Sequence, residues 1–453
     1  MPVSPRAPEK PVYRWARRLV NIEPGELTAL AWSFLYFFTL LCGYYIIRPM
    51  RDAMGIAGGV DKLQWLFTGT FLVMLAAVPL FGWVASRFPR RRFVPYVYYF
   101  FIANLILFFL LFRLELTDAW VARAFFIWTS VYNLFVVSVF WSFLADLFTN
   151  AQAKRLFGFV AAGGTAGALT GPALTALLAV PLGATNLLLV SAGFLAVSAL
   201  CVHQLVDWYQ QQPRKGNRMN AVPAERAMGG TILAGIRLVL QSPYLLGICL
   251  LMLLFTTLST ILYFHQAQIV RDTFANSAER TAAFAVIDLT VNTLTLAIQM
   301  FLTARLVKAL GIGGTLALVP VLLAAGFAAL ALAPVFAVLA VVQVIRRAGD
   351  YALTRPAREM LYVVLGREEK YKAKNFIDTV VYRGGDAVSA WAYAGLRSLG
   401  LGLSAIAWIA VPLTLLWGWV SWRLGEQQGK IARQQIAPRR RRRNNHVRLN
   451  TRS

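Results

Sequence analysis

Two arginines near the end of the first apolar stretch share one face of a predicted helix with a tyrosine. Tyr44, Arg48 and Arg51 are spaced by four and three residues, which places them on one stripe of an α-helix. A guanidinium group is planar and donates two parallel hydrogen bonds, so this pair suits an anion that carries phosphate or carboxylate. The alternative is that both arginines flank the membrane and extend their charged ends into water.

Polar residues recur at helical spacing in three later apolar stretches. Ionisable groups inside a membrane cost several kcal/mol unless they are paired or hydrated, so each is a functional candidate. The three stripes are Asp288, Asn292, Thr295 and Gln299; Gln343, Arg346 or Arg347, Asp350 and Thr354; and Asp378, Tyr382, Asp386 and Ser389, with Lys374 one turn earlier. Asp378 and Asp386 could bind protons or neutralise Arg383 and Lys374, and the sequence leaves both roles open.

Neither catalytic nor metal-binding chemistry is indicated. The three cysteines, Cys42, Cys201 and Cys249, fall inside apolar stretches and lack the spacing of metal ligands. No nucleophile and base stand at a spacing typical of an active site. We therefore expect neither an enzyme nor a cofactor.

The composition indicates the elements that must position these residues. Of the 453 residues, 58% are hydrophobic and 14% are charged, and apolar runs of about 20 residues, long enough to cross a bilayer, recur along the chain. Because lipid offers no hydrogen bonds to the backbone, runs of this length must be helices. The predicted fold is an all-α integral membrane protein with about twelve spans, at 27–47, 63–84, 93–112, 120–142, 156–180, 184–206, 243–264, 282–304, 313–333, 335–354, 376–396 and 401–422.

The spans divide into two pseudo-symmetric halves of six helices. The predicted segments are a cytoplasmic tail at 1–25, a first half at 26–207, a polar loop at 208–230, a second half at 231–423 and a basic tail at 424–453. Repeats of this kind place a substrate site near the middle of the membrane, and the halves expose it alternately to each side.

The positive charge is unevenly distributed along the chain. The net charge is +25, and 36 of the 45 lysines and arginines lie in the two tails and in alternate loops. This bias predicts that both termini are cytoplasmic. We expect the five arginines at 439–443 to lie in a disordered tail near anionic lipid, and we do not expect a nucleic-acid partner.

Two segments resemble motifs of the major facilitator superfamily. GWVASRFPRRRF, from Gly82 to Phe93, resembles the loop motif that follows its second helix and contains Arg87. Gly158, Gly167, Gly171 and Pro172 match the spacing of its antiporter motif. The alternative is close helix packing through small residues four apart, Gly163, Gly167 and Gly171.

A third segment resembles a more specific family, the nucleotide transporters of plastids and obligate intracellular bacteria. RRAGDYALTRPAREMLYVVLGREEKYKAKNFIDTVVYRGGD, at 346–386, is similar to their tenth loop and eleventh helix. The resemblance implies exchange of ADP for ATP, or uptake of other nucleotides, across a bacterial cytoplasmic membrane. By position it makes Arg51, Lys370, Lys372 and Lys374 counterparts of functional basic residues. The glutamates that the family carries in its fourth and seventh helices have no counterpart here, so another anionic substrate stays open.

Together these features predict a secondary transporter of a small anion. The candidate substrate contacts are Tyr44, Arg48, Arg51, Asn133, Asp288, Asn292, Arg346, Lys370, Lys372 and Lys374. The candidate coupling and gating residues are Asp350, Asp378, Asp386 and Arg87. The alternative is a proton-coupled exporter of an unrelated solute, with an intramembrane aspartate as the proton carrier.

Overall fold

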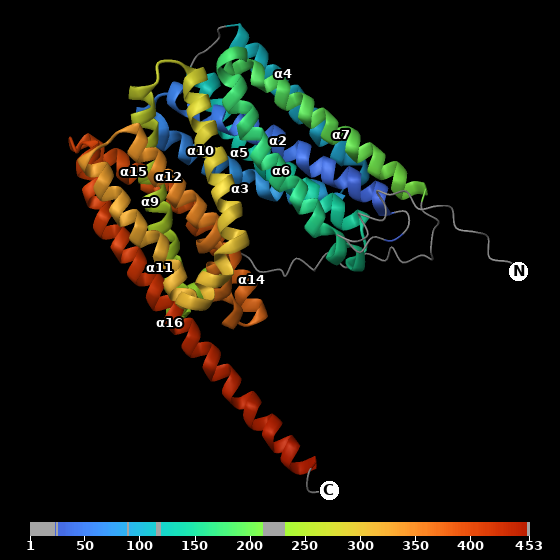
Figure 1. Ribbon diagram of the computed structural model, residues 1–453, viewed down its shortest axis with the longest axis vertical. Coiled ribbons are helices and arrows are strands. Elements are labelled where there is room, and N and C mark those ends of the chain that lie inside the picture. The colour runs from blue at the N-terminus through green and yellow to red at the C-terminus, as the bar shows by residue number, and fades with distance from the viewer. Residues whose placement is uncertain (1–22, 24–25, 88–89, 115–118, 212–231, 451–453) are drawn as a thin grey trace, which may run out of the picture. The chain divides into compact units, whose positions relative to one another are not determined.

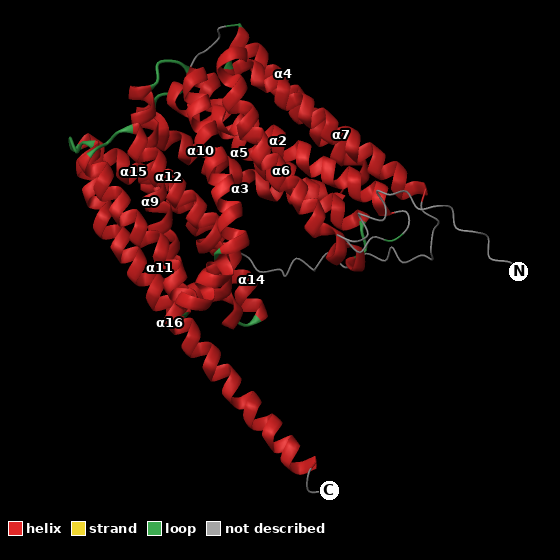
Figure 2. Ribbon diagram, viewed as in Figure 1, coloured by secondary structure: helices red, strands yellow, loops and turns green. Residues whose placement is uncertain are grey.

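The computed structural model describes residue 23 and residues 26–87, 90–114, 119–211 and 232–450, and within them it contains helices and no strand. Figure 2 shows these helices in red, joined by short loops. The predicted central loop and the tail before residue 23 lie outside the described residues. The predicted all-α membrane fold is confirmed.

Ten of the described helices are long and apolar enough to cross a membrane. They include α2 (Glu26–Ala57), α3 (Leu63–Arg87), α4 (Arg90–Arg113), α5 (Ala119–Leu147), α6 (Asn150–Leu182), α7 (Leu187–Gln211), α9 (Pro243–Thr273), α10 (Ser277–Phe301), α11 (Thr303–Leu332) and α16 (Leu403–Asn450). A short amphipathic helix, α8 (Ile232–Gln241), precedes α9. Each of the ten long helices is therefore built on a run that hydropathy alone selects.

The predicted tenth and eleventh spans are helices interrupted by one wide turn each. The tenth runs through α12 (Phe336–Gly349), a π-helical turn at Asp350–Thr354 and α13 (Arg355–Leu361). After the short turn at Tyr362–Val364, the chain continues through α14 (Arg367–Phe376), a second π-helical turn at Ile377–Val381 and α15 (Tyr382–Ser398). Because π-helical turns are rare and occur frequently at functional sites, both interruptions mark residues 350–381 as a candidate functional region.

The chain forms two compact units whose boundaries differ from the predicted halves. Among the described residues, the first contains 23, 26–62, 72–87, 90–114, 119–211 and 274–289, and the second contains 63–71, 232–273 and 290–450. The first turns of α3 thus belong to the second unit, where the indole of Trp391 donates to Thr68 Oγ1 at 3.0 Å. The first turns of α10 belong to the first unit, where they carry Asp288 to α2. Each unit therefore includes part of a helix from the other half of the sequence.

Helix α2 is the centre of the first unit and packs against α5, α6 and α7 (Figure 1). Its Phe37 ring stacks on Phe140 of α5 with 4.2 Å between the ring centroids. On the α7 side, Thr39 and Ser198 share a buried hydrogen bond of 2.8 Å. The core on this side of the unit is rich in aromatic residues, which bury much area per side chain.

The contact between α2 and α6 depends on glycines at four-residue spacing. A Cβ added at Gly171 would stand 2.7 Å from the carbonyl oxygen of Cys42, and one at Gly167 would overlap the carbonyl of Phe38. No atom lies within 4 Å of a Cβ added at Gly158. The close-packing interpretation of these glycines thus accounts for Gly167 and Gly171, because only glycine lets the two backbones approach this closely.

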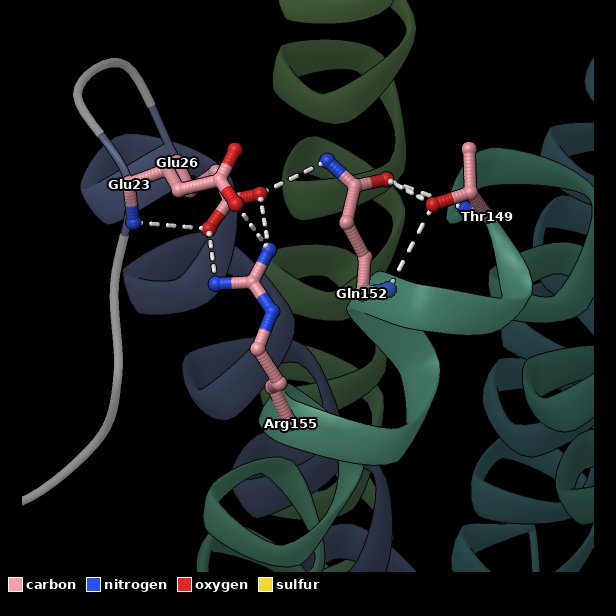
Figure 3. A network of polar contacts seen from close by, with 5 residues as sticks. All are labelled: Glu23, Glu26, Thr149, Gln152 and Arg155. Carbon is pink, nitrogen blue, oxygen red and sulfur yellow. Dashed lines mark hydrogen bonds and ion pairs between the residues drawn. The ribbon is translucent and has the colours of Figure 1, made fainter.

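A polar network holds the start of α2 to the start of α6 (Figure 3). The Glu26 carboxylate accepts from Gln152 Nε2 at 2.8 Å and from Arg155 Nη2 at 3.0 Å. Thr149 and Gln152 form a capping box, which satisfies the first free N–H groups of α6. Glu23 adds an ion pair of 3.1 Å to the same arginine. The network and the glycines together fasten α2 to α6 along their lengths.

Helices α11 and α16 lie side by side in the second unit (Figure 1). Gln435 of α16 donates to the carbonyl of Val364 at 2.8 Å, beside the α13–α14 turn. The helix continues to Asn450, so the basic tail is helical and not disordered as the sequence predicts. Arginine and glutamine are good helix formers, and they extend a helix that the membrane span has already nucleated.

We expect Gly167→Ala to destabilise the protein by about 1–3 kcal/mol, the usual effect of overpacking a tight contact. Thermal unfolding of the purified protein in detergent measures the change. Gly158→Ala is the matched control in the same helix and should unfold at the wild-type temperature or slightly above it. Equal effects of the two substitutions would contradict the proposed packing.

Candidate functional site

Four polar side chains from α9 and α12 form one network in the second unit. Ser259 and Gln266 are seven residues apart on α9, and Gln343 and Arg346 are three apart on α12, so each pair shares a helix face. Gln343 Nε2 donates to Gln266 Oε1 at 2.6 Å. Arg346 Nη1 donates to Ser259 Oγ at 3.0 Å. The network joins the two helices through hydrogen bonds alone.

Arg346 uses both edges of its guanidinium group on neutral oxygens. Its Nε and Nη2 atoms both donate to Gln343 Oε1, at 3.3 and 3.2 Å. With the bond to Ser259, all of its described hydrogen bonds go to uncharged partners. The Nε and Nη2 atoms that converge on this single amide oxygen form the edge that can donate two parallel hydrogen bonds to a carboxylate or phosphate. This is the property of the site that an anion could use.

Asp350 does not pair with Arg346, although the two residues share a predicted stripe. Its carboxylate accepts from Arg355 Nε at 3.0 Å, and the Arg355 group also lies over the Tyr351 ring at 4.4 Å from its centroid. The partners are five residues apart across the π-helical turn at Asp350–Thr354. The wider turn brings residues five apart closer to one face than an α-helix would.

The short helix α13 takes part in three ion pairs with described residues. Arg355 binds Asp350, and Arg358 Nη2 lies 3.5 Å from Asp378 Oδ1 in the second π-helical turn. Lys374 of α14 lies 2.7 Å from Glu359. Two predicted coupling residues, Asp350 and Asp378, are therefore both held by arginines of one helix.

The structure brings Arg48 and Asp288 together in the first unit. Arg48 Nη1 lies 3.4 Å from Asp288 Oδ2, and the Asp288 side chain is 2% exposed. The two residues come from different predicted stripes, one on α2 and one on α10, so the sequence analysis does not predict that they pair. The pair stabilises a carboxylate that would otherwise be costly in this position.

Arg51 lies against α5 instead of beside Arg48. Its Nε donates to the carbonyl of Phe126 at 3.3 Å, and the guanidinium group stands 3.9 Å from the centroid of that ring. Its Nη1 atom lies 3.1 Å from Asp52. Tyr44 stacks on Tyr132 with ring centroids 6.4 Å apart. The sequence therefore identifies residues that pack at the end of α2, but it does not predict their partners.

The other predicted site residues are dispersed. Asn133 is half-buried in α5, and Asn292 is half-buried in α10. Lys370 and Lys372 lie on different faces of α14, since residues two apart on a helix do not face each other. Arg87 is exposed, with its charge over Trp83 at 4.8 Å. Asp386 lies 4.0 Å from Arg383, which matches the neutralising role that the sequence left open.

Ser259 and Gln266 are the site residues that the sequence analysis does not select. The signal was available, because both are polar, stand seven residues apart and interrupt an apolar helix. Gln343 appears in a predicted stripe but not among the candidate contacts. Among the described residues, no group of three histidine, cysteine, aspartate or glutamate side chains could hold a metal ion.

The sequence matches the Major Facilitator Superfamily over residues 27–353, and the chain belongs to this superfamily. It is a multi-pass membrane transporter and not an enzyme. The chain is 22% identical to ADP,ATP carrier protein 1 of Chlamydia muridarum (strain MoPn / Nigg), in an alignment of 470 residues that covers 89% of each chain.

Solved structures with the same fold include several transporters. A bacterial homologue of the human lysosomal transporter Spinster matches with a TM-score of 0.57 and 14% identity over 90% of this chain and 99% of that one. The POT family transporter PepTSo matches with a TM-score of 0.61 and 12% identity over 88% and 98%. The nucleoside transporter NupG matches with a TM-score of 0.53 and 12% identity over 90% and 99%. At these identities the likeness shows the fold.

We expect Arg48→Met and Asp288→Asn each to cost about 2–4 kcal/mol, because each leaves its charged partner buried without this contact. The double variant should cost less than the sum of the two. A double-mutant cycle from thermal unfolding in detergent measures the coupling. The exposed pair Arg271 and Asp272 is the control and should show coupling below about 0.5 kcal/mol. Additive losses at Arg48 and Asp288 would contradict a stabilising pair.

Proposed function

We propose that this protein is a secondary antiporter that moves a phosphorylated or other organic anion by alternating access, with Arg346 as the principal anion-binding residue. The observation that carries the proposal is the set of neutral partners around this guanidinium group. An anion that replaced the Gln343 oxygen would form charge-assisted hydrogen bonds, which are about twice as strong as neutral ones.

Four other arginines support this choice by contrast. Arg48, Arg51, Arg355 and Arg358 each lie within 3.5 Å of a carboxylate, so an anion would have to compete with a charged group. Arg346 requires only that a neutral amide be displaced. It also belongs to α12, which leads into the segment that resembles the nucleotide transporters. The relative named as an ADP,ATP carrier makes a nucleotide the first anion to test.

The other predicted contacts, the location and the lipid partner are proposed as well. Arg48, Arg51, Asn292 and the lysines of α14 are further candidates for substrate contact, and Asp350 and Asp378 are candidates for gating. The uneven distribution of lysine and arginine supports a location in a bacterial cytoplasmic membrane with both termini inside. Anionic lipid is the proposed partner of the basic tail.

Arg346→Ala should abolish anion exchange while the protein still inserts and folds, because the variant removes the only donor fork of the network. Arg346→Lys should retain the charge and recover little activity, since lysine lacks the planar fork. The measurement uses liposomes preloaded with ADP and follows uptake of labelled ATP, phosphate and an organic anion, with and without a pH gradient. Arg271→Ala is the control at an exposed arginine. Wild-type exchange by Arg346→Ala would remove this residue from the site.

Gln343→Glu should place a permanent carboxylate on Arg346 and so compete with the substrate. We expect the concentration of anion at half-maximal uptake to rise at least about tenfold, which corresponds to about 1.4 kcal/mol. Gln343→Met fills similar space without an acceptor and should not raise that concentration. If the glutamate variant transports as the wild type does, the amide oxygen of Gln343 does not occupy the anion position.

A further inference from the structure

His265 lies fully buried on α9, with a backbone carbonyl oxygen facing each of its ring nitrogens. Nδ1 is 2.9 Å from the oxygen of Ile261 on the same helix, and Nε2 is 2.9 Å from the oxygen of Leu403 at the start of α16. The ring meets Tyr393 of α15 edge-on, with 5.8 Å between centroids. The histidine thus connects α9 to α16 beside α15.

A carbonyl oxygen can only accept a hydrogen bond, so each ring nitrogen that bonds to one must carry a proton. The neutral imidazole has one N–H, so it can donate to only one of the two oxygens. The other nitrogen would then direct its lone pair at a carbonyl lone pair, which is repulsive. Only the imidazolium form, with an N–H on each nitrogen, makes both bonds. The two-carbonyl arrangement is therefore the arrangement of a protonated histidine.

The groups around the ring determine when that form is stable. Tyr393 and Arg397, both on α15, are the titratable and charged side chains that face it. Burial and the positive charge of Arg397 oppose the imidazolium, whereas the two carbonyl oxygens favour it. The doubly bonded state consequently forms as the pH falls and is lost as the pH rises.

The segment that His265 holds is the turn between α15 and α16, which Arg397 also stabilises. Its Nη1 atom donates to the carbonyl of Leu401 at 3.1 Å, in the turn between α15 and α16. Gly400 in this turn has φ of +85°, a conformation that favours glycine and defines a sharp bend. His265 fastens the far end of the same turn through Leu403. Loss of the proton would release one of the two bonds that the ring makes.

We propose that His265 is a proton-binding site that controls how firmly the α15–α16 turn is attached to α9. The site differs from the aspartates predicted as proton carriers, since Asp288, Asp378 and Asp386 each lie within 4.0 Å of an arginine. A proton on one of those aspartates would cost an ion pair, whereas a proton on His265 completes a hydrogen bond. The inference does not depend on the anion site at Arg346.

The first test is nuclear magnetic resonance of the protein labelled with ¹⁵N-histidine in lipid nanodiscs. The chain has three histidines, and His265→Gln and His203→Gln assign two of them and leave His446 as the third. Between about pH 4.5 and 8, which spans the ordinary histidine pKa, we expect the His265 ring to gain a second, solvent-protected N–H as the pH falls. A ring that stays neutral throughout this range, or whose protons exchange as fast as those of an exposed histidine, would overturn the proposal.

Hydrogen exchange of the turn at residues 399–403 tests the consequence. After correction for the intrinsic effect of pH, exchange in the wild type should slow by about fivefold as His265 becomes protonated, the factor that one hydrogen bond of typical net strength gives. His265→Gln should lose this dependence. His203→Gln is the control, because His203 meets the Tyr99 hydroxyl, which can donate or accept. The same pH dependence in the wild type and His265→Gln would refute the proposed attachment.

Discussion

The absence of water around most of these helices is the constraint on which the arrangement depends. A charge or polar group within a span must find its partner inside the protein, and the partner almost always comes from another helix or another turn. Arg48 forms an ion pair with Asp288, Arg358 with Asp378, and Arg355 with Asp350. Each pairing fixes two segments relative to each other within one compact unit, so the polar residues organise the packing that hydrophobic contacts alone would leave less specific.

Arg346 differs from these three arginines because its hydrogen-bond partners carry no charge. Its half-buried guanidinium group is bonded to an amide and a hydroxyl, and neither partner neutralises its charge. In the anion site that we propose, the bound amide oxygen would keep the empty site ordered, and an anion would replace it without a rearrangement of the two helices.

The sequence could predict the spans and several members of the site because both depend on short-range periodicity. Hydropathy selected the helices, and helical spacing placed Gln343 and Arg346 on one face. The sequence could not predict partners on other helices, since nothing in the spacing of Arg48 on α2 indicates a contact with Asp288 on α10. For the same reason, the sequence does not predict that α3 and α10 are each divided between the two compact units.

The π-helical turns explain why two of the predicted stripes, Gln343 to Thr354 and Asp378 to Ser389, do not follow a constant helical period. Each of them runs through a segment in which the turn is wider than in an α-helix. Past Asp350 the facing residue is Arg355 and not Thr354, and Asp378 turns to Arg358 of another helix. Asp350 and Asp378 each stand at a wide turn and pair with an arginine of α13, and neither forms an ion pair with Arg346. The irregular backbone is therefore consistent with the proposed role of this guanidinium group in anion binding.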